Sequence, residues 1–378
     1  MSVKQKVSAS EAMGILERKA EYIQICTTME VEAKDNTLWN DIHLVHECLP
    51  ELDRDEIDLS VELLGHHFDY PFFITALTGG HPQATTINEN LARAAEHFSI
   101  GLELGSQRVL LNFPEVEPTF SIARKVAPQA FLVANIGTAQ LINQPDSPAY
   151  TVDQIESVID TAKANALAIH LNFLQEAVMF DGDTKATGCL KAIGEIAHSV
   201  SVPVIVKETG AGISKSCALR FEEQGISALE LGGAGGTSMA LVESHRAALH
   251  HNPKYERLGK SFASWGIPTP ISIVETRDGS LPIIASGGIR TGLDAAKAFA
   301  LGADLVGVAR PLLCCALEGP EAVMEWLEVF FAELSVALFL SGASSIKEMK
   351  QKRMVIVGRM REWLQQLGYE KRLASKRQ

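Results

Sequence analysis

Short apolar runs recur along the chain after residue 70, and stretches with polar residues at helical spacing separate most of them. Each run is bounded by proline, glycine or a polar cluster, as is typical of buried strands. We therefore predict eight strands. They cover residues 72–74, 100–102, 131–133, 167–169, 204–206, 228–231, 283–285 and 305–308.

Two of the intervening stretches carry clear apolar stripes at helical spacing. The first stripe consists of Val152, Ile155, Val158, Ile159 and Ala162, and the second of Leu293, Ala296 and Ala300. Strands that are apolar throughout and alternate with helices indicate a parallel sheet covered on its outside. Because there are eight of them, the pattern favours an α/β fold of the (β/α)8 TIM-barrel type over a doubly wound sheet.

The predicted barrel, residues 71–345, leaves a segment at each end of the chain. Residues 1–70 are expected to contribute to a substrate site and to the base of the barrel. Residues 346–378 are rich in lysine and arginine and are expected to form a basic helical tail. A long connection, residues 232–270, separates the sixth and seventh strands, and connections of this length are usually functional.

Composition is that of an ordinary globular protein, with 46% apolar and 21% charged residues among 378. The net charge of −12 disfavours nucleic acid as a partner but allows a local basic pocket. The six cysteines show no C-x-x-C spacing, which favours a reducing, cytoplasmic compartment and no structural metal. We expect no secretory signal and no membrane span, because the N-terminus lacks an apolar core and glutamates interrupt the apolar stretch 323–340.

Polar residues follow the predicted strands at their carboxyl ends, where barrels of this type carry their chemistry. A single threonine or asparagine in such a turn caps the backbone more often than it binds a ligand. A lysine such as Lys207 at the barrel mouth needs an anion or a ring to face. The other candidates are Thr75, Thr78, Ser106, Gln107, Arg108, Asn135, His170, Asn172, Gln175, Glu176, Glu208, Thr237 and Ser286. Their convergence on one rim indicates an active site.

The last two strand ends are typical of a phosphate site. One strand runs into Gly287-Gly288 and the next into Ala309-Arg310. Glycine lets backbone amides approach an anion closely, and TIM barrels often bind phosphate with the loops after strands seven and eight. A tight turn alone is the alternative for the glycine pair in isolation.

Together these motifs resemble those of a known family. The run "ASGGIRTGLDAAKAFALGADLVGVARP" is similar to the FMN-phosphate region of several flavin-dependent TIM barrels. The motifs "ERKAEYIQI", "ITALTGG", "LGSQR", "ANIG", "HLNFLQE", "VPVIVKETGAGIS", "GGAGGTS" and "WGIPT" resemble, in order, those of the type II, FMN-dependent isopentenyl-diphosphate isomerases. The match covers roughly residues 17 to 311.

The resemblance implies a role for each matching residue. FMN would be held by Ala76, Leu77, Thr78, Ser106, Asn135, Lys207 and Thr237, with its phosphate against Gly287, Gly288, Ala309 and Arg310. The substrate diphosphate would meet Arg18, Lys19, Arg108, His170 and Asn172. Gln175 would lie beside the reacting carbons as the catalytic residue, and Glu176 would bind Mg²⁺. The resemblance also implies a homo-oligomer, either a tetramer or an octamer.

Moving a double bond by one carbon requires the addition of one proton and the removal of another, and an amide such as Gln175 cannot act as the acid. On the implied mechanism, FMN is first reduced by NADPH and then serves as acid and base without net redox change. Gln175 would orient or relay the proton.

Several positions depart from the family motifs. Tyr22 stands where the Arg-Lys-x-Glu-His motif has its histidine, Leu77 replaces a methionine, and Thr184 and Ala186 replace arginine and phenylalanine. Lys185 is the nearest substitute for that arginine. Ser238, Thr209 and Ala211 are milder changes. These departures leave open a flavin-binding paralogue that has lost activity or uses another prenyl phosphate.

The second alternative is an FMN-dependent 2-hydroxy-acid oxidoreductase. Enzymes of that type need a histidine base after the sixth strand, where this chain reads Gly-Gly-Ala-Gly-Gly-Thr over residues 232–237. An inosinate dehydrogenase would need a nucleophilic cysteine in a strand-end loop, and neither Cys189 nor Cys217 is suitably placed.

Overall fold

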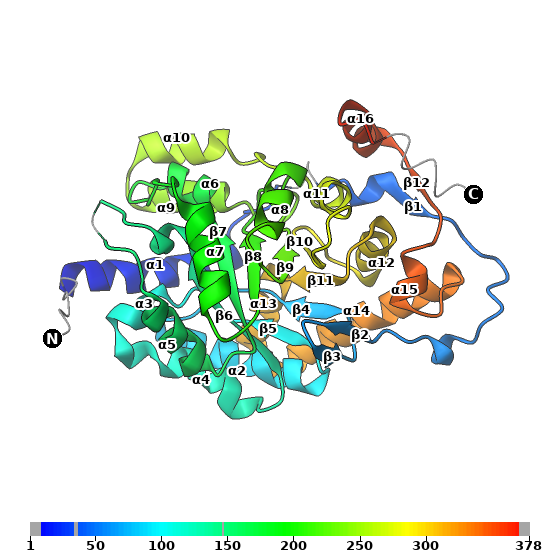
Figure 1. Ribbon diagram of the computed structural model, residues 1–378, viewed down its shortest axis with the longest axis horizontal. Helices are drawn as coiled ribbons and strands as arrows, with labels where there is room; N and C mark the ends of the chain where they lie inside the picture. The colour runs from blue at the N-terminus through cyan, green and yellow to red at the C-terminus, as the bar shows by residue number, and fades with distance from the viewer. Residues whose placement is uncertain (1–8, 34–36, 146, 370–378) are drawn as a thin grey trace.

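The computed structural model describes residues 9–33, 37–145 and 147–369, with residues 9–16 as backbone only. Eight parallel strands close into a barrel in the order β10-β11-β4-β5-β6-β7-β8-β9 (Figure 1). The strands are β4 (Phe72–Ile74), β5 (Gly101–Glu103), β6 (Phe131–Gly137), β7 (Ala166–Leu171), β8 (Val204–Glu208), β9 (Ala228–Glu230), β10 (Ile283–Ser286) and β11 (Leu305–Val308). The predicted (β/α)8 barrel is confirmed, and each predicted run coincides with a strand to within a few residues at its ends.

Helices surround the barrel and separate successive strands. The longer ones are α2 (Pro82–His97), α4 (Pro118–Val126), α5 (Val152–Ala162), α7 (Cys189–Ser199), α8 (Lys215–Glu222), α11 (Thr269–Thr276), α12 (Gly292–Leu301), α13 (Arg310–Glu318) and α14 (Pro320–Leu340). Short elements are α3 (Arg108–Asn112), α6 (Phe173–Val178) and the 3-10 turns η2 (Trp39–Asp41), η3 (Arg54–Glu56), η4 (Pro114–Val116) and η5 (Thr138–Leu141). No helix in the described part of the chain combines the length and apolarity that crossing a membrane requires.

Two helices show how local sequence begins an element. The Thr151 hydroxyl accepts from the Gln154 amide and the Gln154 side chain accepts from the Thr151 amide, which is a capping box that starts α5. The predicted stripe of α5 is buried from Ile155 to Ala162. In α12 the stripe prediction is wrong at Leu293, which is 46% exposed. The helix is instead buried on two sides, because α14 covers the face that does not meet the barrel.

A hairpin closes the amino-terminal end of the barrel. It consists of β2 (Val61–Leu63) and β3 (His66–Phe68), which pair antiparallel. The Phe68 ring lies 5.4 Å from the Phe73 ring and 5.3 Å from the Phe131 ring, centroid to centroid. Its side chain joins the apolar cluster of the barrel interior, so this end is filled by packed side chains.

The remaining elements lie outside the barrel proper (Figure 1). Helix α1 (Ala9–Thr28) contacts α13 and α9 (Met239–Leu249), and α9 packs on α10 (Pro253–Ser261); α9 and α10 occupy the long connection after β9. Residues 346–369 form α15 (Ile346–Met349), β12 (Met354–Ile356) and α16 (Gly358–Gln366). This segment differs from the expected wholly helical tail, because its apolar, β-branched run 354–356 pairs antiparallel with β1 (Ile42–Leu44).

Candidate functional site

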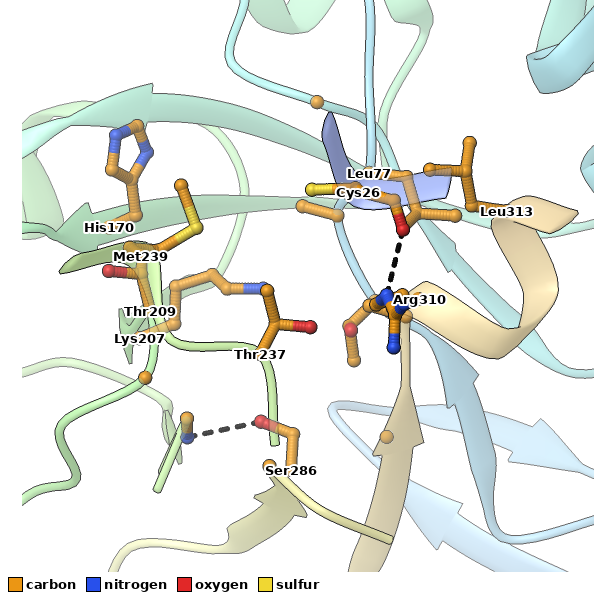
Figure 2. Close-up of a pocket in the computed structure, with 18 of the residues that line it drawn as sticks. Cys26, Leu77, His170, Lys207, Thr209, Thr237, Met239, Ser286, Arg310 and Leu313 are labelled. Atoms are coloured by element: carbon orange, nitrogen blue, oxygen red, sulfur yellow. Dashed lines mark hydrogen bonds between the residues drawn. The ribbon is translucent and has the colours of Figure 1, made fainter. Parts of the chain in front are cut away.

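A cavity of about 260 Å³ opens at the carboxyl ends of the strands, close to the lower end of the size range of small-molecule sites. All eight strand ends contribute side chains or backbone to its wall, and α1 adds Lys19, Tyr22, Ile23 and Cys26. Figure 2 shows side chains from several strand ends around this cavity. A dashed line marks the hydrogen bond that Arg310 donates to the backbone carbonyl of Cys26.

The cavity brings together most of the residues that the sequence nominated. Those in its wall are Lys19, Ala76, Leu77, Thr78, Ser106, Asn135, His170, Gln175, Lys207, Thr237, Gly287, Gly288, Ala309 and Arg310. Arg18, Arg108, Asn172 and Glu176 are absent from the wall. Arg108 is instead paired with Asp183 at 2.9 Å, and Arg18 lies 3.7 Å from Asp181. Thr184 and Lys185 are exposed, so Lys185 does not replace the missing arginine at the cavity wall.

Lys207 lies between two buried carboxylates at the bottom of the site. Its Nζ pairs with Glu103, and it is 2.8 Å from Glu230 Oε2. Burial opposes the charge on Lys207, but the two carboxylates outweigh burial and raise its pKa above the ordinary range. Burial and the charge of Glu103 raise the pKa of Glu230 to about 8. Neither glutamate was among the predicted site residues, although a charged residue inside an apolar run, as in the two "LEL" runs at residues 102–104 and 229–231, is a usable signal.

His170 is neutral in this environment. Its Nδ1 lies 2.7 Å from Asn135 Oδ1. Burial, followed by the charges of Lys207, Lys19 and Arg108, lowers the pKa of His170 to about 3. Burial, Arg18 and Arg108 also lower the pKa of Lys19 to about 8. Cations crowded in this way favour a bound anion, because an anion would relieve their mutual repulsion.

Gln175 forms a closed set of hydrogen bonds with two residues from other elements. Its Nε2 donates to Tyr22 Oη at 3.0 Å and to Glu243 Oε1 at 2.7 Å. The Tyr22 hydroxyl also donates to Glu243 Oε1, at 2.6 Å. Glu243 lies on α9 and is 1% exposed. The sequence carried no signal for Glu243, because a single glutamate on a surface-like helix is unremarkable until the helix is placed.

Glu176 is buried beside the cavity. Its Oε1 accepts from Asn172 Nδ2 at 2.8 Å, and its Oε2 accepts from the Asp183 amide at 2.7 Å. Burial raises the pKa of Glu176, and a bound cation would act in the opposite direction by favouring the charged form. Within the described ranges no three His, Cys, Asp or Glu side chains gather into a metal cluster. A Mg²⁺ ion here would therefore need oxygens from a bound anion in addition to Glu176.

The opposite end of the cavity fits a phosphate group. Gly287 and Gly288 have φ values of +103° and +73°, and a Cβ on Gly288 would lie 2.6 Å from the Gly235 carbonyl oxygen. Glycine is thus required for the turn and for the close approach of the two loops. The carboxylate of Glu32 bridges Arg310 at 2.8 Å and Arg290 at 2.7 Å. Arg290 was not among the predicted residues.

This donor set suits FMN. Two arginines, a glycine turn and the first turn of α13 provide positive charge and amide groups for a phosphate. Lys207 provides a buried cation on the far side of the same cavity. No feature of the wall requires a different cofactor.

Comparison with known proteins agrees with this assignment. The profile of the FMN-dependent dehydrogenase family matches residues 134–356. An isopentenyl-diphosphate delta-isomerase of Methanosarcina mazei is 46% identical over 93% of this chain and 95% of its own length. Enzymes of the same name from Methanothermobacter thermautotrophicus and Pyrococcus abyssi are 43% and 44% identical over 96% and 92% of this chain, and over 99% and 94% of their own lengths.

Solved structures support the fold alone, because their sequence identity is low. A putative lactate oxidase of Pediococcus acidilactici superposes with a TM-score of 0.61 at 16% identity, covering 94% of this chain and 96% of its own. A flavocytochrome b2 mutant gives 0.63 at 18%, covering 93% and 88%. On its sequence relatives, this chain belongs to the type II, FMN-dependent isopentenyl-diphosphate delta-isomerase family.

Proposed function

We propose that the protein interconverts isopentenyl diphosphate and dimethylallyl diphosphate, with FMN reduced by NADPH and with Mg²⁺ on the diphosphate. When bound, reduced FMN supplies a proton donor and acceptor beside the double bond, without net redox change. The names of the relatives support isopentenyl diphosphate as the substrate. The residues of the cavity wall support a mechanism in which the cofactor transfers the protons and the protein binds and orients the substrate.

The observation that carries the proposal is the set of side chains around Gln175, none of which is placed to act as the acid. Gln175 is an amide, and His170 is neutral with a pKa of about 3, so neither is a usable acid near neutral pH. Lys207 holds its proton between two carboxylates. A cofactor that carries the proton fits this arrangement.

Two carboxyls, Glu208 and Glu230, line the described wall; Glu230 is paired with Lys207, which leaves Glu208 for separate consideration. Burial raises its pKa to about 7, which is suitable for acid–base work. Its Oε2 accepts hydrogen bonds from the amides of Thr209, Gly210 and Ala211. Through this oxygen Glu208 anchors its own loop, which ties the carboxylate to a structural role.

The diphosphate would lie near the cationic group at the α1 side of the cavity. Lys19 lines the wall, and its Nζ donates to the Ser106 carbonyl at 3.3 Å. Arg18 and Arg108 lie outside the wall but are close enough for their charges to act on Lys19. Asn172 would donate to the same anion through the second proton of its Nδ2, and His170 would lie beside it. Glu176 would hold Mg²⁺ after releasing its bond to the Asp183 amide, which leaves a carboxylate oxygen for the metal.

The test is an assay of the FMN-loaded protein with NADPH, Mg²⁺ and isopentenyl diphosphate under anaerobic conditions. We expect dimethylallyl diphosphate to form and solvent deuterium to enter it, with no NADPH consumed beyond the flavin reduction. Gln175→Ala should lower kcat by at least about tenfold and leave FMN affinity unchanged. Gln144→Ala is the matched control, because Gln144 is an equally buried glutamine that bonds only to backbone groups and lies outside the cavity wall.

Two results would favour the alternatives. Bound, reducible FMN without any product would support a flavin-binding paralogue or a different prenyl-phosphate substrate. Oxidation of a 2-hydroxy acid would support the oxidoreductase, although residues 232–237 offer no histidine base.

A further inference from the structure

We propose that Tyr22 is a positioning residue that, together with Glu243, fixes the Gln175 amide so that its carbonyl oxygen faces the cavity. This inference rests on the proposed function, in which Gln175 lies beside the reacting carbons. It assigns a role to Tyr22, which occupies the position where the resembling motif has histidine.

The hydrogen-bond inventory fixes the orientation of the amide. Glu243 is paired with Arg246, and a carboxylate in an ion pair accepts hydrogen bonds, so its Oε1 faces the NH₂ group of Gln175, 2.7 Å away. A phenol has one proton, and of its two acceptors the Glu243 carboxylate at 2.6 Å is stronger and closer than the Met179 thioether at 3.6 Å, so Tyr22 gives the proton to Glu243. Tyr22 can then only accept from Gln175, at 3.0 Å. The NH₂ group of Gln175 is therefore directed at Tyr22 and Glu243.

The carbonyl oxygen of Gln175 is left for the cavity. Gln175 is 8% exposed and lines the wall, and no hydrogen bond from the described part of the chain reaches its Oε1. An acceptor held at this place can orient a proton donor or stabilise positive charge that develops on a substrate carbon. The reverse orientation would place the amide oxygen against the Glu243 carboxylate.

Glu243 is itself held rigidly. Arg246 Nη1 lies 3.3 Å from Glu243 Oε2, and Arg246 also pairs with Asp181 at 2.9 Å and with Glu21 at 3.0 Å. These contacts join α9 to α1 and to the loop after α6. The position of the Gln175 amide therefore depends on three separate elements.

The Tyr22 hydroxyl can accept from Gln175 and donate to Glu243 at any pH at which the phenol keeps its proton. Burial and the charge of Glu243 raise the pKa of Tyr22 well above its usual value, and Arg18 and Arg246 only partly oppose them. A histidine here would accept from Gln175 only while neutral, and it would lose that ability on protonation near its usual pKa of about 6.5.

The other possible role for Tyr22 is donation to the diphosphate. The two roles predict different kinetics, because positioning of Gln175 matters in the transition state and diphosphate binding matters in the ground state. Tyr22→Phe should lower kcat by about tenfold, as expected for one lost hydrogen bond, with KM for isopentenyl diphosphate unchanged. A raised KM at unchanged kcat, or no change in either, would overturn the proposal.

Tyr22→His provides a second readout that a purely structural role would not move. The ratio of its kcat to that of the wild type should fall as pH is lowered from about 8 to about 6, because the imidazolium cannot accept from Gln175. A ratio that stays constant with pH would contradict the assignment.

A stability measurement tests the contact between Gln175 and Glu243 without any turnover. Gln175→Glu would place a carboxylate against Glu243, so one of the pair must bind a proton in the folded state. A carboxyl pKa that is higher in the folded than in the unfolded protein means stability that is lost as pH rises. The melting temperature of Gln175→Glu should therefore lie below that of the wild type by more at about pH 8 than at about pH 5.

The double variant Gln175→Glu/Glu243→Gln swaps the two groups and should remove this pH-dependent deficit. A Gln175→Glu variant with wild-type stability at both pH values would overturn the contact between the two side chains, and with it the proposal. These outcomes are separate from the proposed function. A wild-type protein that binds FMN and forms no product refutes the function, while the stability comparison still decides how the amide is held.

Discussion

Lys207 shows at the scale of one residue why a buried charge needs partners. It is 5% exposed, and its two carboxylates come from different parts of the barrel, Glu230 from the adjacent strand β9 and Glu103 from β5, which does not pair with β8. The cluster has one more negative than positive charge when both glutamates are ionised, which agrees with the raised pKa of Glu230. Removal of the lysine would leave two carboxylates facing each other without a cation.

We predict that Lys207→Met lowers the free energy of unfolding by about 3–5 kcal/mol, the usual cost of breaking a buried ion pair. The loss should be larger at about pH 8 than at about pH 6, because the folded protein then needs a protonated carboxyl. Lys297→Met is the matched control. Lys297 is also buried, but its Nζ donates to the Trp39 carbonyl at 2.9 Å. This variant should lose only about 1 kcal/mol. Urea unfolding at both pH values measures the difference.

His170 gives a second prediction, on acid stability. Its pKa of about 3 in the folded protein lies below the ordinary 6.5. Between pH 6.5 and pH 3, His170 binds a proton in the unfolded chain but not in the folded protein. The folded state is therefore increasingly destabilised as pH falls from 6.5 toward 3. The wild type should lose melting temperature relative to His170→Asn over this window. A difference between the two proteins that is independent of pH would show that His170 is not held neutral.

At the scale of elements, the turn after β10 depends on backbone approach. Gly288 and Gly65 share a φ of +73°, but a Cβ on Gly65 would meet nothing within 4 Å. A Cβ on Gly288 would lie 2.6 Å from the Gly235 carbonyl oxygen. The two glycines therefore separate the cost of a left-handed backbone from the cost of contact between two loops.

We predict that Gly65→Ala costs about 1 kcal/mol of stability, the penalty for the backbone conformation alone. Gly288→Ala should cost at least about 1 kcal/mol more, because the loops must move apart. It should also weaken FMN binding, while Gly65→Ala should not. Urea denaturation and flavin fluorescence titration measure the two effects. Equal stability losses in the two variants would contradict the contact argument.

At the scale of the whole molecule, segments outside the barrel close both of its ends. The β2–β3 hairpin fills the amino-terminal end through Phe68, and α1 adds Lys19 and Tyr22 to the cavity at the carboxyl end. The first part of the chain thus contributes to the core at one end and to the site at the other. Assembly into a tetramer or octamer stays a prediction, which light scattering would test.

We predict that Phe68→Ala lowers the free energy of unfolding by about 3–5 kcal/mol, because a fully buried aromatic ring is replaced by a cavity. FMN affinity should change little, since Phe68 lies at the end of the barrel opposite to the site. Leu49→Ala, in the same N-terminal segment but at a leucine 66% exposed, should change stability by less than about 0.5 kcal/mol. A large loss of FMN affinity in Phe68→Ala would show that the two ends are coupled.

The sequence alone determined the features whose physical signal is local. Apolar runs predicted the eight strands because each is buried on both faces, and the same strand-end pattern nominated Lys207 and the glycine pair. The capping box at Thr151 begins α5 with residues three positions apart. Such signals need no knowledge of distant parts of the chain.

The tertiary structure decided which distant groups meet. It placed Glu103 and Glu230 around Lys207, and it brought Tyr22 and Glu243 to Gln175. It also paired β12 with β1, and it left Leu293 exposed by covering two other sides of α12. A buried charge or amide is stable only with its partners, and those partners are chosen by the packing of whole elements, which periodicity along the chain does not encode.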